Sequence, residues 1–314
     1  MKRAFPFIKD NRVLLFTILL VAVMSVINRS FAKPDNIYAI LISLPAYGMC
    51  ALGLGISLIC GELNISMGSV MAFTGVVFAI LTRNGMQFCL ALLIVLLLCV
   101  VWGLVGGFFV AIMKVDSFVV TLSLMTLIRG VALLLSGQQP VVIKDTWLIS
   151  LGKIRLGPVP LTAILLLVFV LIGEYMLKQT VFGRNLYAIG ANKEIARSIG
   201  TNIEFHKVAV FVIYSVCACI GGIFLASRMN TGSPVAGSDA PLTVIPMVIL
   251  GGTALSGGRG GALKTLLGVI LLQTVFNCMS LYSITQNVQL LVKGLIVLGI
   301  VVWDKYSINR WKKV

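Results

Sequence analysis

The run FCLALLIVLLLCVVWGLVGGFFVAIM, residues 88–113, carries no charged side chain over 26 positions. A helix that crosses the hydrocarbon core of a bilayer needs about 20 predominantly apolar residues, so this run is long enough to span a membrane. Comparable runs recur along the 314-residue chain, in which 59% of residues are hydrophobic and 11% are charged. Soluble domains carry about 25% charged residues. The composition therefore predicts one polytopic membrane domain over residues 1–314 rather than a pair of soluble domains.

The hydrophobic pattern predicts an all-α bundle with about ten membrane segments. The eighth segment is too short to span alone and contains Pro241 and Pro246. A short, proline-interrupted segment is typical of a broken or re-entrant helix, which needs protein or a water-filled cavity around its backbone. The ten predicted segments are 13–28, 37–60, 66–81, 88–113, 117–136, 159–177, 207–227, 241–252, 262–280 and 286–303.

The basic residues predict the orientation of this bundle. With an even number of segments and cytoplasmic termini, sixteen Lys and Arg residues fall on the cytoplasmic side and seven on the outer side. This asymmetry agrees with the excess of positive charge in cytoplasmic loops. A signal peptide cleaved after Ser30-Phe31-Ala32 is an alternative, but it would move the basic C-terminal end outside. We therefore expect an uncleaved first segment and both termini in the cytoplasm. Because the net charge of +15 is spread over loops, we expect no nucleic-acid partner.

The residue types that usually carry catalysis are scarce. Seven cysteines lie mostly within apolar segments without zinc-type spacing, and we interpret them as packing residues. The single histidine, His206, is expected in a loop. We expect no catalytic residue and no metal ligand. The ten carboxylates fall in loops or near segment ends, which disfavours an ion-coupled secondary transporter but leaves that alternative open.

One polar stretch interrupts the second half of the chain: GRNLYAIGANKEIARSIG, residues 183–200. Glu194 and Arg197 are spaced i,i+3, and Ile195 and Ile199 are spaced i,i+4 on another face. This spacing predicts a short amphipathic helix beneath the membrane, bracketed by Gly190 and Gly200. A solvated spacer and a docking helix for a cytoplasmic partner both fit the pattern.

The stretch resembles the cytoplasmic loop of permease subunits from bacterial ABC importers of the ribose and simple-sugar family, which reads GR-x-x-YA-x-G-x-N-x-E-A-A-x-x-x-G. Four other strings also resemble the family: GELNISMGS (61–69), TLSLMTLIRGVALLLSGQQP (121–140), VILGGTALSGGRGG (248–261) and QLLVKGLIVLGIVVWDK (289–305). The resemblance implies a coupling loop at about 178–207 that docks on an ATPase subunit. The implied coupling residues are Gly183, Arg184, Tyr187, Gly190, Asn192, Glu194, Ala196, Arg197 and Gly200.

The resemblance also implies the activity and the partners. It implies a sugar permease of the bacterial plasma (inner) membrane, paired with a second permease subunit, identical or different, and served by an extracytoplasmic sugar-binding protein. The chain itself would be no enzyme and would bind no cofactor, since ATP-Mg would be held by the ATPase partner. The run GRGGALKT, residues 258–265, agrees with this, because Leu263 replaces the glycine that precedes the lysine of a phosphate-binding loop.

Polar and glycine residues near two apolar segments are candidates for a translocation path. A cytoplasmic turn and close helix packing explain them equally well. The family often has acidic residues where this chain has Asn64, Pro241 and Thr243, which leaves the identity of the substrate open. We expect Arg129, inside a segment, to reach the outer surface or to line a polar cavity. The predicted path residues are Asn64, Ser66, Ser69, Asp239, Thr243, Gly251, Gly252, Thr253 and Ser256.

Overall fold

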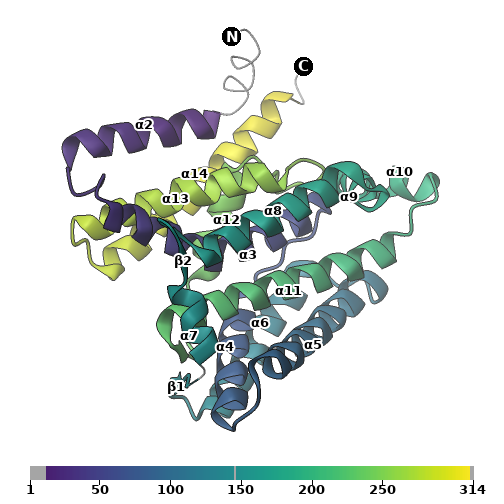
Figure 1. The fold of residues 1–314 in the computed structure, drawn as a ribbon. Helices are drawn as coiled ribbons and strands as arrows, with labels where there is room; N and C mark the ends of the chain where they lie inside the picture. The colour runs from purple at the N-terminus through teal and green to yellow at the C-terminus, as the bar shows by residue number, and fades with distance from the viewer. Residues whose placement is uncertain (1–11, 145, 312–314) are drawn as a thin grey trace.

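The computed structural model describes residues 12–144 and 146–311, and these residues form a helical bundle (Figure 1). The predicted all-α class is confirmed. The helices are α2 (Arg12–Ile27), α3 (Pro34–Ile59), α4 (Met67–Arg83), α5 (Phe88–Gly107) with the π-helical turn η1 (Phe108–Ile112), α6 (Ser117–Ser136), α7 (Thr146–Lys153), α8 (Leu161–Gln179), α9 (Val181–Ala191), α10 (Lys193–Ser198), α11 (Ile203–Met229), α12 (Ala240–Leu250), α13 (Ala262–Leu281) and α14 (Gln286–Trp311).

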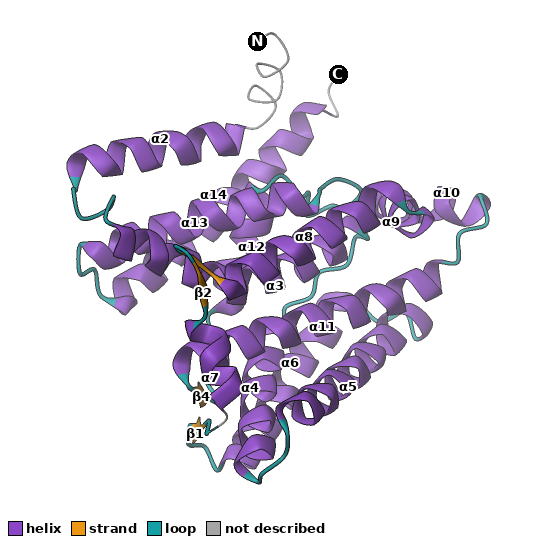
Figure 2. Ribbon diagram, viewed as in Figure 1, coloured by secondary structure: helices purple, strands orange, loops and turns teal. Residues whose placement is uncertain are grey.

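Four two-residue strands complete the described elements, and all of them lie in connections between helices (Figure 2). Strand β1 (Val141–Val142) pairs antiparallel with β4 (Thr231–Gly232) and ties the segment after α6 to the end of α11. Strand β2 (Arg155–Leu156) pairs with β3 (Val159–Pro160) in a hairpin that precedes α8. These pairs stabilise loops and leave the helical core unchanged.

Each of the ten predicted apolar segments is helical, but they differ in length. Among the described residues, six helices are long and apolar enough to cross a membrane, and the other four are shorter apolar helices. The basic residues Lys2, Arg3, Lys9, Lys312 and Lys313, which entered the predicted orientation, lie outside the described residues. The six long helices are Pro34–Ile59, Phe88–Ile112, Ser117–Ser136, Leu161–Gln179, Ile203–Met229 and Ala262–Leu281.

Helix α11 lies at the centre of one half of the bundle, between α3, α4 and α5 (Figure 1). Glycines bring its backbone close to its neighbours, as is common between membrane helices. A Cβ atom on Gly103 of α5 would lie 2.7 Å from the Cα of Val212, and one on Gly107 would lie 2.8 Å from the Cα of Val208. Gly103 and Gly107 therefore allow α5 to pack closely against α11.

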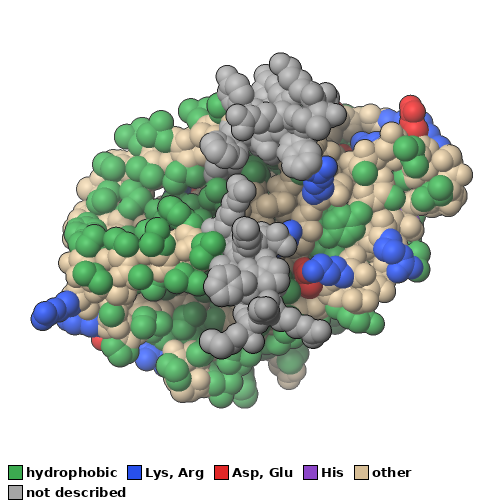
Figure 3. Space-filling view, turned by 90° about the horizontal axis from the view of Figure 1, so that it is seen from above, with side chains coloured by type: hydrophobic (Ala, Val, Ile, Leu, Met, Phe, Trp, Pro, Cys, Tyr) green, Lys and Arg blue, Asp and Glu red, His purple; other side chains and the backbone are tan. Residues whose placement is uncertain are grey.

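Hydrophobic side chains cover much of the outer surface. In Figure 3 they dominate the left part of the visible face, whereas most basic and acidic side chains lie to the right, with a few at the far left. Helix α5 illustrates this: Leu93, Leu97 and Val101 are about half exposed. Six of the seven cysteines are buried, and only Cys89 is exposed, which agrees with their interpretation as packing residues.

Two polar residues have partners or positions that residue types alone do not reveal. Arg129 is half-buried in α6, and its Nη1 donates to the carbonyl oxygens of Pro234 (2.6 Å) and Ala236 (2.9 Å). These carbonyls belong to the loop between α11 and α12. Because this loop is not helical, the carbonyls do not take part in hydrogen bonds within a helix and can accept from Arg129. His206 lies in the first turns of α11 and is buried, not in a loop.

Candidate functional site

The polar segment forms two helices, α9 and α10, at one end of the molecule, where α10 projects beyond the bundle (Figure 1). Side-chain caps set their boundaries, as expected for Thr and Asn at helix N-termini. The Thr180 hydroxyl accepts from the amide of Gly183 and begins α9. The Asn192 side chain accepts from the amides of Glu194 (2.9 Å) and Ile195 (3.1 Å) and begins α10.

Of the two predicted boundaries of the amphipathic helix, the one at Gly200 agrees with the structure and the one at Gly190 does not. Gly200 adopts a φ of +82° just beyond α10 and ends it as predicted, because this conformation favours glycine. The bracket predicted at Gly190 is wrong, since Gly190 lies inside α9 and Asn192 supplies the start of α10. The predicted pair of Glu194 and Arg197 is replaced by a longer-range one: Arg197 Nη2 lies 3.1 Å from Glu204 Oε1.

The predicted coupling residues fall into two groups. One group holds α9 and α10 against the rest of the molecule: Gly183 and Ala196 are buried, and the Tyr187 hydroxyl donates to the carbonyl oxygen of Gly260 at 3.0 Å. Gly190 is half-buried beside the backbone of Ile59. The other group is exposed and consists of Arg184, Asn192, Glu194, Arg197 and Gly200.

Three large apolar side chains at the same end were not among the predicted coupling residues. Ile195, Ile199 and Phe205 are 61%, 67% and 63% exposed. Exposed apolar side chains rimmed by charges are typical of a surface that contacts another molecule. The signal in the sequence is the isoleucine pair spaced i,i+4 within an otherwise polar stretch.

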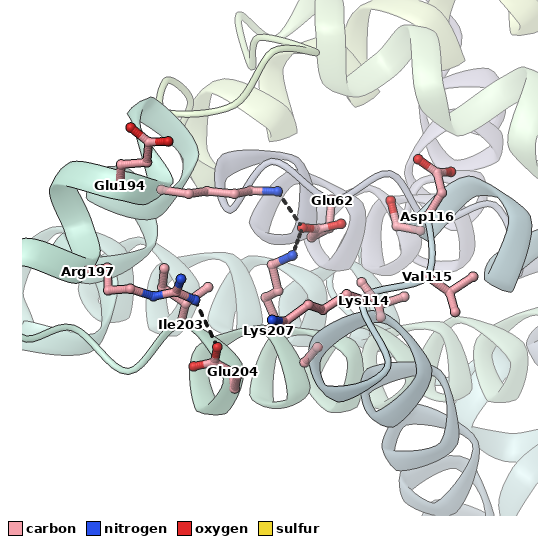
Figure 4. A pocket seen from close by; sticks show the side chains of 13 residues that line it. Glu62, Lys114, Val115, Asp116, Glu194, Arg197, Ile203, Glu204 and Lys207 are labelled. Carbon is pink, nitrogen blue, oxygen red and sulfur yellow. Dashed lines mark hydrogen bonds and ion pairs between the residues drawn. The ribbon is translucent and has the colours of Figure 1, made fainter.

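A cavity of about 470 Å³ lies between α10, the start of α11, the turn after η1 and the turn between α3 and α4 (Figure 4). Glu62 lies at its inner wall with a side chain only 5% exposed, and its Oε1 accepts from Lys207 (2.6 Å) and Lys193 (3.2 Å). The lining residues are Glu62, Val110, Ala111, Lys114, Val115, Asp116, Ser117, Lys193, Glu194, Arg197, Ile203, Glu204 and Lys207.

The charges of this cavity are paired rather than of one sign, since four acidic and four basic residues line it. Burial acts to lower the pKa of Lys193, but the Glu62 carboxylate outweighs this effect and raises that pKa above its ordinary value. The ammonium therefore stays charged. No group of three His, Cys, Asp or Glu residues suited to a metal ion occurs in the described part of the chain. Three ion pairs line the cavity, those of Glu62 with Lys193 and Lys207 and that of Arg197 with Glu204.

The predicted path residues lie in three separate places, and none of them lines this cavity. The first place is the turn between α3 and α4. There the Asn64 side chain accepts from the amide and hydroxyl of Ser66 at 3.0 and 2.8 Å. The Tyr214 hydroxyl donates to the Asn64 carbonyl (3.0 Å) and accepts from the Met67 amide (2.9 Å), while Ser69 donates to the Met125 carbonyl. These polar groups stabilise the turn.

The second place is the start of α12. Asp239 Oδ2 lies 2.5 Å from Lys293 Nζ of α14, and its Oδ1 accepts from the Tyr47 hydroxyl at 3.3 Å. Thr243 donates to the Asp239 carbonyl at 3.1 Å. Lys293, a charged residue within an apolar helix, is thus compensated by an ion pair. Three helices, α3, α12 and α14, thus contribute to one polar cluster.

The third place is the loop between α12 and α13, which contains Gly251, Gly252, Thr253 and Ser256. A Cβ on Gly251 would lie 2.5 Å from the Lys264 carbonyl, so this glycine allows close packing on α13. Thr253 is buried, whereas Gly252 and Ser256 are exposed. The predicted path residues therefore lie in three separate places in the bundle, apart from the charged cavity beside α10.

Comparison with known proteins identifies the relatives of this chain. The profile of a family described as branched-chain amino acid transport system / permease component matches residues 36–301. The chain is 32% identical over 306 residues to the Ribose import permease protein RbsC of Haemophilus influenzae, covering 96% of this chain and 94% of the relative. It is 34% identical over 278 residues to the L-arabinose transport system permease protein AraH of Escherichia coli, covering 88% and 85%. No solved structure gives a significant match.

Proposed function

The chain belongs to the family described as branched-chain amino acid transport system / permease component, and from this premise we propose that it is the transmembrane subunit of an ATP-driven sugar importer. The observation that carries the proposal is that similarity to ribose and L-arabinose permeases extends over 88–96% of the chain. A permease subunit is a multi-pass protein of the inner membrane, and the energy for transport comes from a separate ATPase subunit, which would hold the ATP-Mg.

The proposed topology has ten membrane segments and both termini in the cytoplasm. The six long helices would be completed by the shorter apolar helices 13–27, 67–83, 240–250 and 286–299. This arrangement is supported by the basic residues of the loops and places α9, α10 and the charged cavity on the cytoplasmic side. A second permease subunit would complete the membrane portion, and an extracytoplasmic binding protein would deliver the sugar.

The proposed contact with the ATPase subunit is the exposed end of the α9–α10 segment. Arg184, Glu194 and Arg197 offer charges, and Ile195 and Ile199 offer apolar area, on a surface that no other described helix covers. An interface needs an apolar centre with a polar rim, and this mixture of side chains supplies both. The buried residues of the segment, among them Gly183 and Ala196, would anchor it to the permease.

The proposed route of the sugar passes the polar groups around α3, α4 and α12. A sugar is neutral and rich in hydroxyl groups, so its path needs paired donors and acceptors rather than a net charge. The Asp239–Lys293 ion pair meets this need, because the two charges compensate each other. Asn64, Pro241 and Thr243 are uncharged, so they add no negative charge to this route.

The test is reconstitution in liposomes with uptake of labelled ribose and L-arabinose. A permease should purify together with an ATPase subunit, and uptake should require ATP and a binding protein. Uptake by the chain alone, driven by a proton or sodium gradient, would instead establish the secondary-transporter alternative. Such carriers place acidic groups deep within their spans, whereas the carboxylate of Asp239 precedes α12 and is neutralised by Lys293.

A further inference from the structure

Three segments that are far apart in the sequence meet backbone to backbone at four glycines. Gly61 follows α3, Gly190 lies in α9, and Gly257 and Gly258 lie between α12 and α13. A Cβ on Gly190 would overlap the carbonyl oxygen of Ile59 and would lie 2.5 Å from the amide nitrogen of Gly258. A Cβ on Gly257 would lie 2.9 Å from the Gly190 carbonyl oxygen and 3.0 Å from the Cα of Gly61. We call this contact the glycine junction.

Hydrogen bonds fasten the same three segments together. The amide of Gly258 donates to the carbonyl oxygen of Ile59 at 3.0 Å, which joins the α12–α13 loop to the end of α3. The Tyr187 hydroxyl joins α9 to the same loop through Gly260. Glu174 of α8 accepts from the amide of Leu263, the second residue of α13, at 3.1 Å. The segments of the glycine junction are therefore joined by hydrogen bonds as well as by close packing.

Glu62, the residue after Gly61, adds buried ion pairs to this unit. Its carboxylate accepts from Lys193 of α10 and from Lys207 of α11, and the Lys207 side chain is 13% exposed (Figure 4). Removing one partner of a buried ion pair leaves an uncompensated charge, which is costly. These ion pairs hold the turn between α3 and α4 to helix α10 and to helix α11.

We propose that the glycine junction and Glu62 transmit movement of the α9–α10 segment to the α3–α4 turn and the α12–α13 loop. This inference rests on the proposed function. Flexible side chains absorb small displacements, but contacts between backbones do not, because close-packed groups move together. The two receiving segments lead directly to Asn64 and Ser66 on one side and to α12 on the other. Glu62, Lys207 and Gly190 are positioning residues in this account, since they act through the segments they join.

The experiment measures sugar uptake and ATP hydrolysis together, in liposomes that contain the full importer with its ATPase subunit and binding protein. In Glu62→Gln and Lys207→Met, the ATPase subunit should stay bound and hydrolysis should continue, because neither side chain belongs to the exposed docking surface. The number of sugars moved per ATP should fall about 5-fold or more, the lower end of typical coupling between sites.

Three further variants make the test specific. Lys207→Arg keeps the positive charge and should restore the wild-type ratio. Lys153→Met is the control, because Lys153 is exposed in α7, which contributes no residue to the junction or to the α9–α10 segment, and it should leave the ratio unchanged. Lys193→Met removes one of the two ion pairs of Glu62. Because the Lys193 side chain is 53% exposed, this variant should insert normally, and it tests the transmission role if the variants at buried positions fail to insert.

The outcomes separate this inference from the proposed function. A wild-type ratio in every inserted Glu62, Lys207 and Lys193 variant overturns the transmission role. The transmission role is also overturned if these variants lose the ATPase subunit while the wild type and the control keep it, since Glu62 would then only shape the docking surface. If the wild-type chain itself neither binds an ATPase subunit nor imports a sugar, the proposed function fails instead.

Discussion

Gly190→Ala should destabilise the protein by about 2–4 kcal/mol, although it adds a single methyl group. The new Cβ would lie 2.5 Å from the amide nitrogen of Gly258, where 3.4 Å is ordinary contact, and both close neighbours are backbone atoms. Helix α9 must therefore move away from the α12–α13 loop. Such overpacking costs about 1–3 kcal/mol, and loss of the hydrogen bond between Gly258 and Ile59 costs about 0.5–1.5 kcal/mol more.

Thermal unfolding of the purified permease in detergent measures this effect. Gly130→Ala in α6 is the matched control, because a Cβ there meets nothing within 4 Å. It should be neutral or slightly stabilising, since glycine in a helix costs about 0.5–1 kcal/mol relative to alanine. Gly200→Ala also meets nothing within 4 Å but has a φ of +82°, so it reports backbone strain alone. If Gly190→Ala unfolds at the same temperature as Gly130→Ala, the three segments do not meet as described.

Two further predictions concern the turn between α3 and α4 and the docking surface. Tyr214→Phe removes the hydroxyl that bonds to the Asn64 carbonyl and the Met67 amide, and it leaves these two buried backbone groups unpaired. Each unpaired group should destabilise the protein by about 1–3 kcal/mol. Unchanged thermal unfolding would contradict this prediction. Ile195→Ser combined with Ile199→Ser should alter stability by less than about 0.5 kcal/mol, because both side chains are exposed. The same double variant should retain less ATPase subunit on purification, and full retention would move the docking surface elsewhere.

Much of the fold could be predicted from the sequence, because apolar runs report directly on membrane helices. The segment predicted at 117–136 coincides with α6, and the short segment with Pro241 and Pro246 is the short helix α12. Helix α9 was missed as a separate helix, since Gly183 and Gly190 lower the helix propensity of its sequence. Thr180 and the packing of Leu186 and Ile189 outweigh that preference.

Partners that are distant in the sequence were beyond prediction. The sequence around Glu62 is compatible with a solvent-exposed turn and with a buried site. Its partners Lys193 and Lys207 lie 131 and 145 residues away, so the local sequence gives no sign of them. The same holds for Arg129, whose acceptors are backbone carbonyls of a later loop. Carbonyl oxygens carry no sequence signal, so neither the burial of these charges nor their partners could be read from residue types.

The glycine junction explains why the strings that resemble sugar permeases are informative together and weak alone. Gly61 belongs to GELNISMGS, Gly190 to the coupling stretch, and Gly257 and Gly258 to VILGGTALSGGRGG. In the sequence the glycines of different strings are more than sixty residues apart, and in the structure each string contributes backbone to one contact. A side chain is sterically excluded at Gly190, Gly257 and Gly258, and Gly61 has a φ of +81° that favours glycine, so the contact constrains all three segments at once. The motifs that place the chain in its family are therefore also the parts of the molecule where a coupling movement would enter the membrane domain.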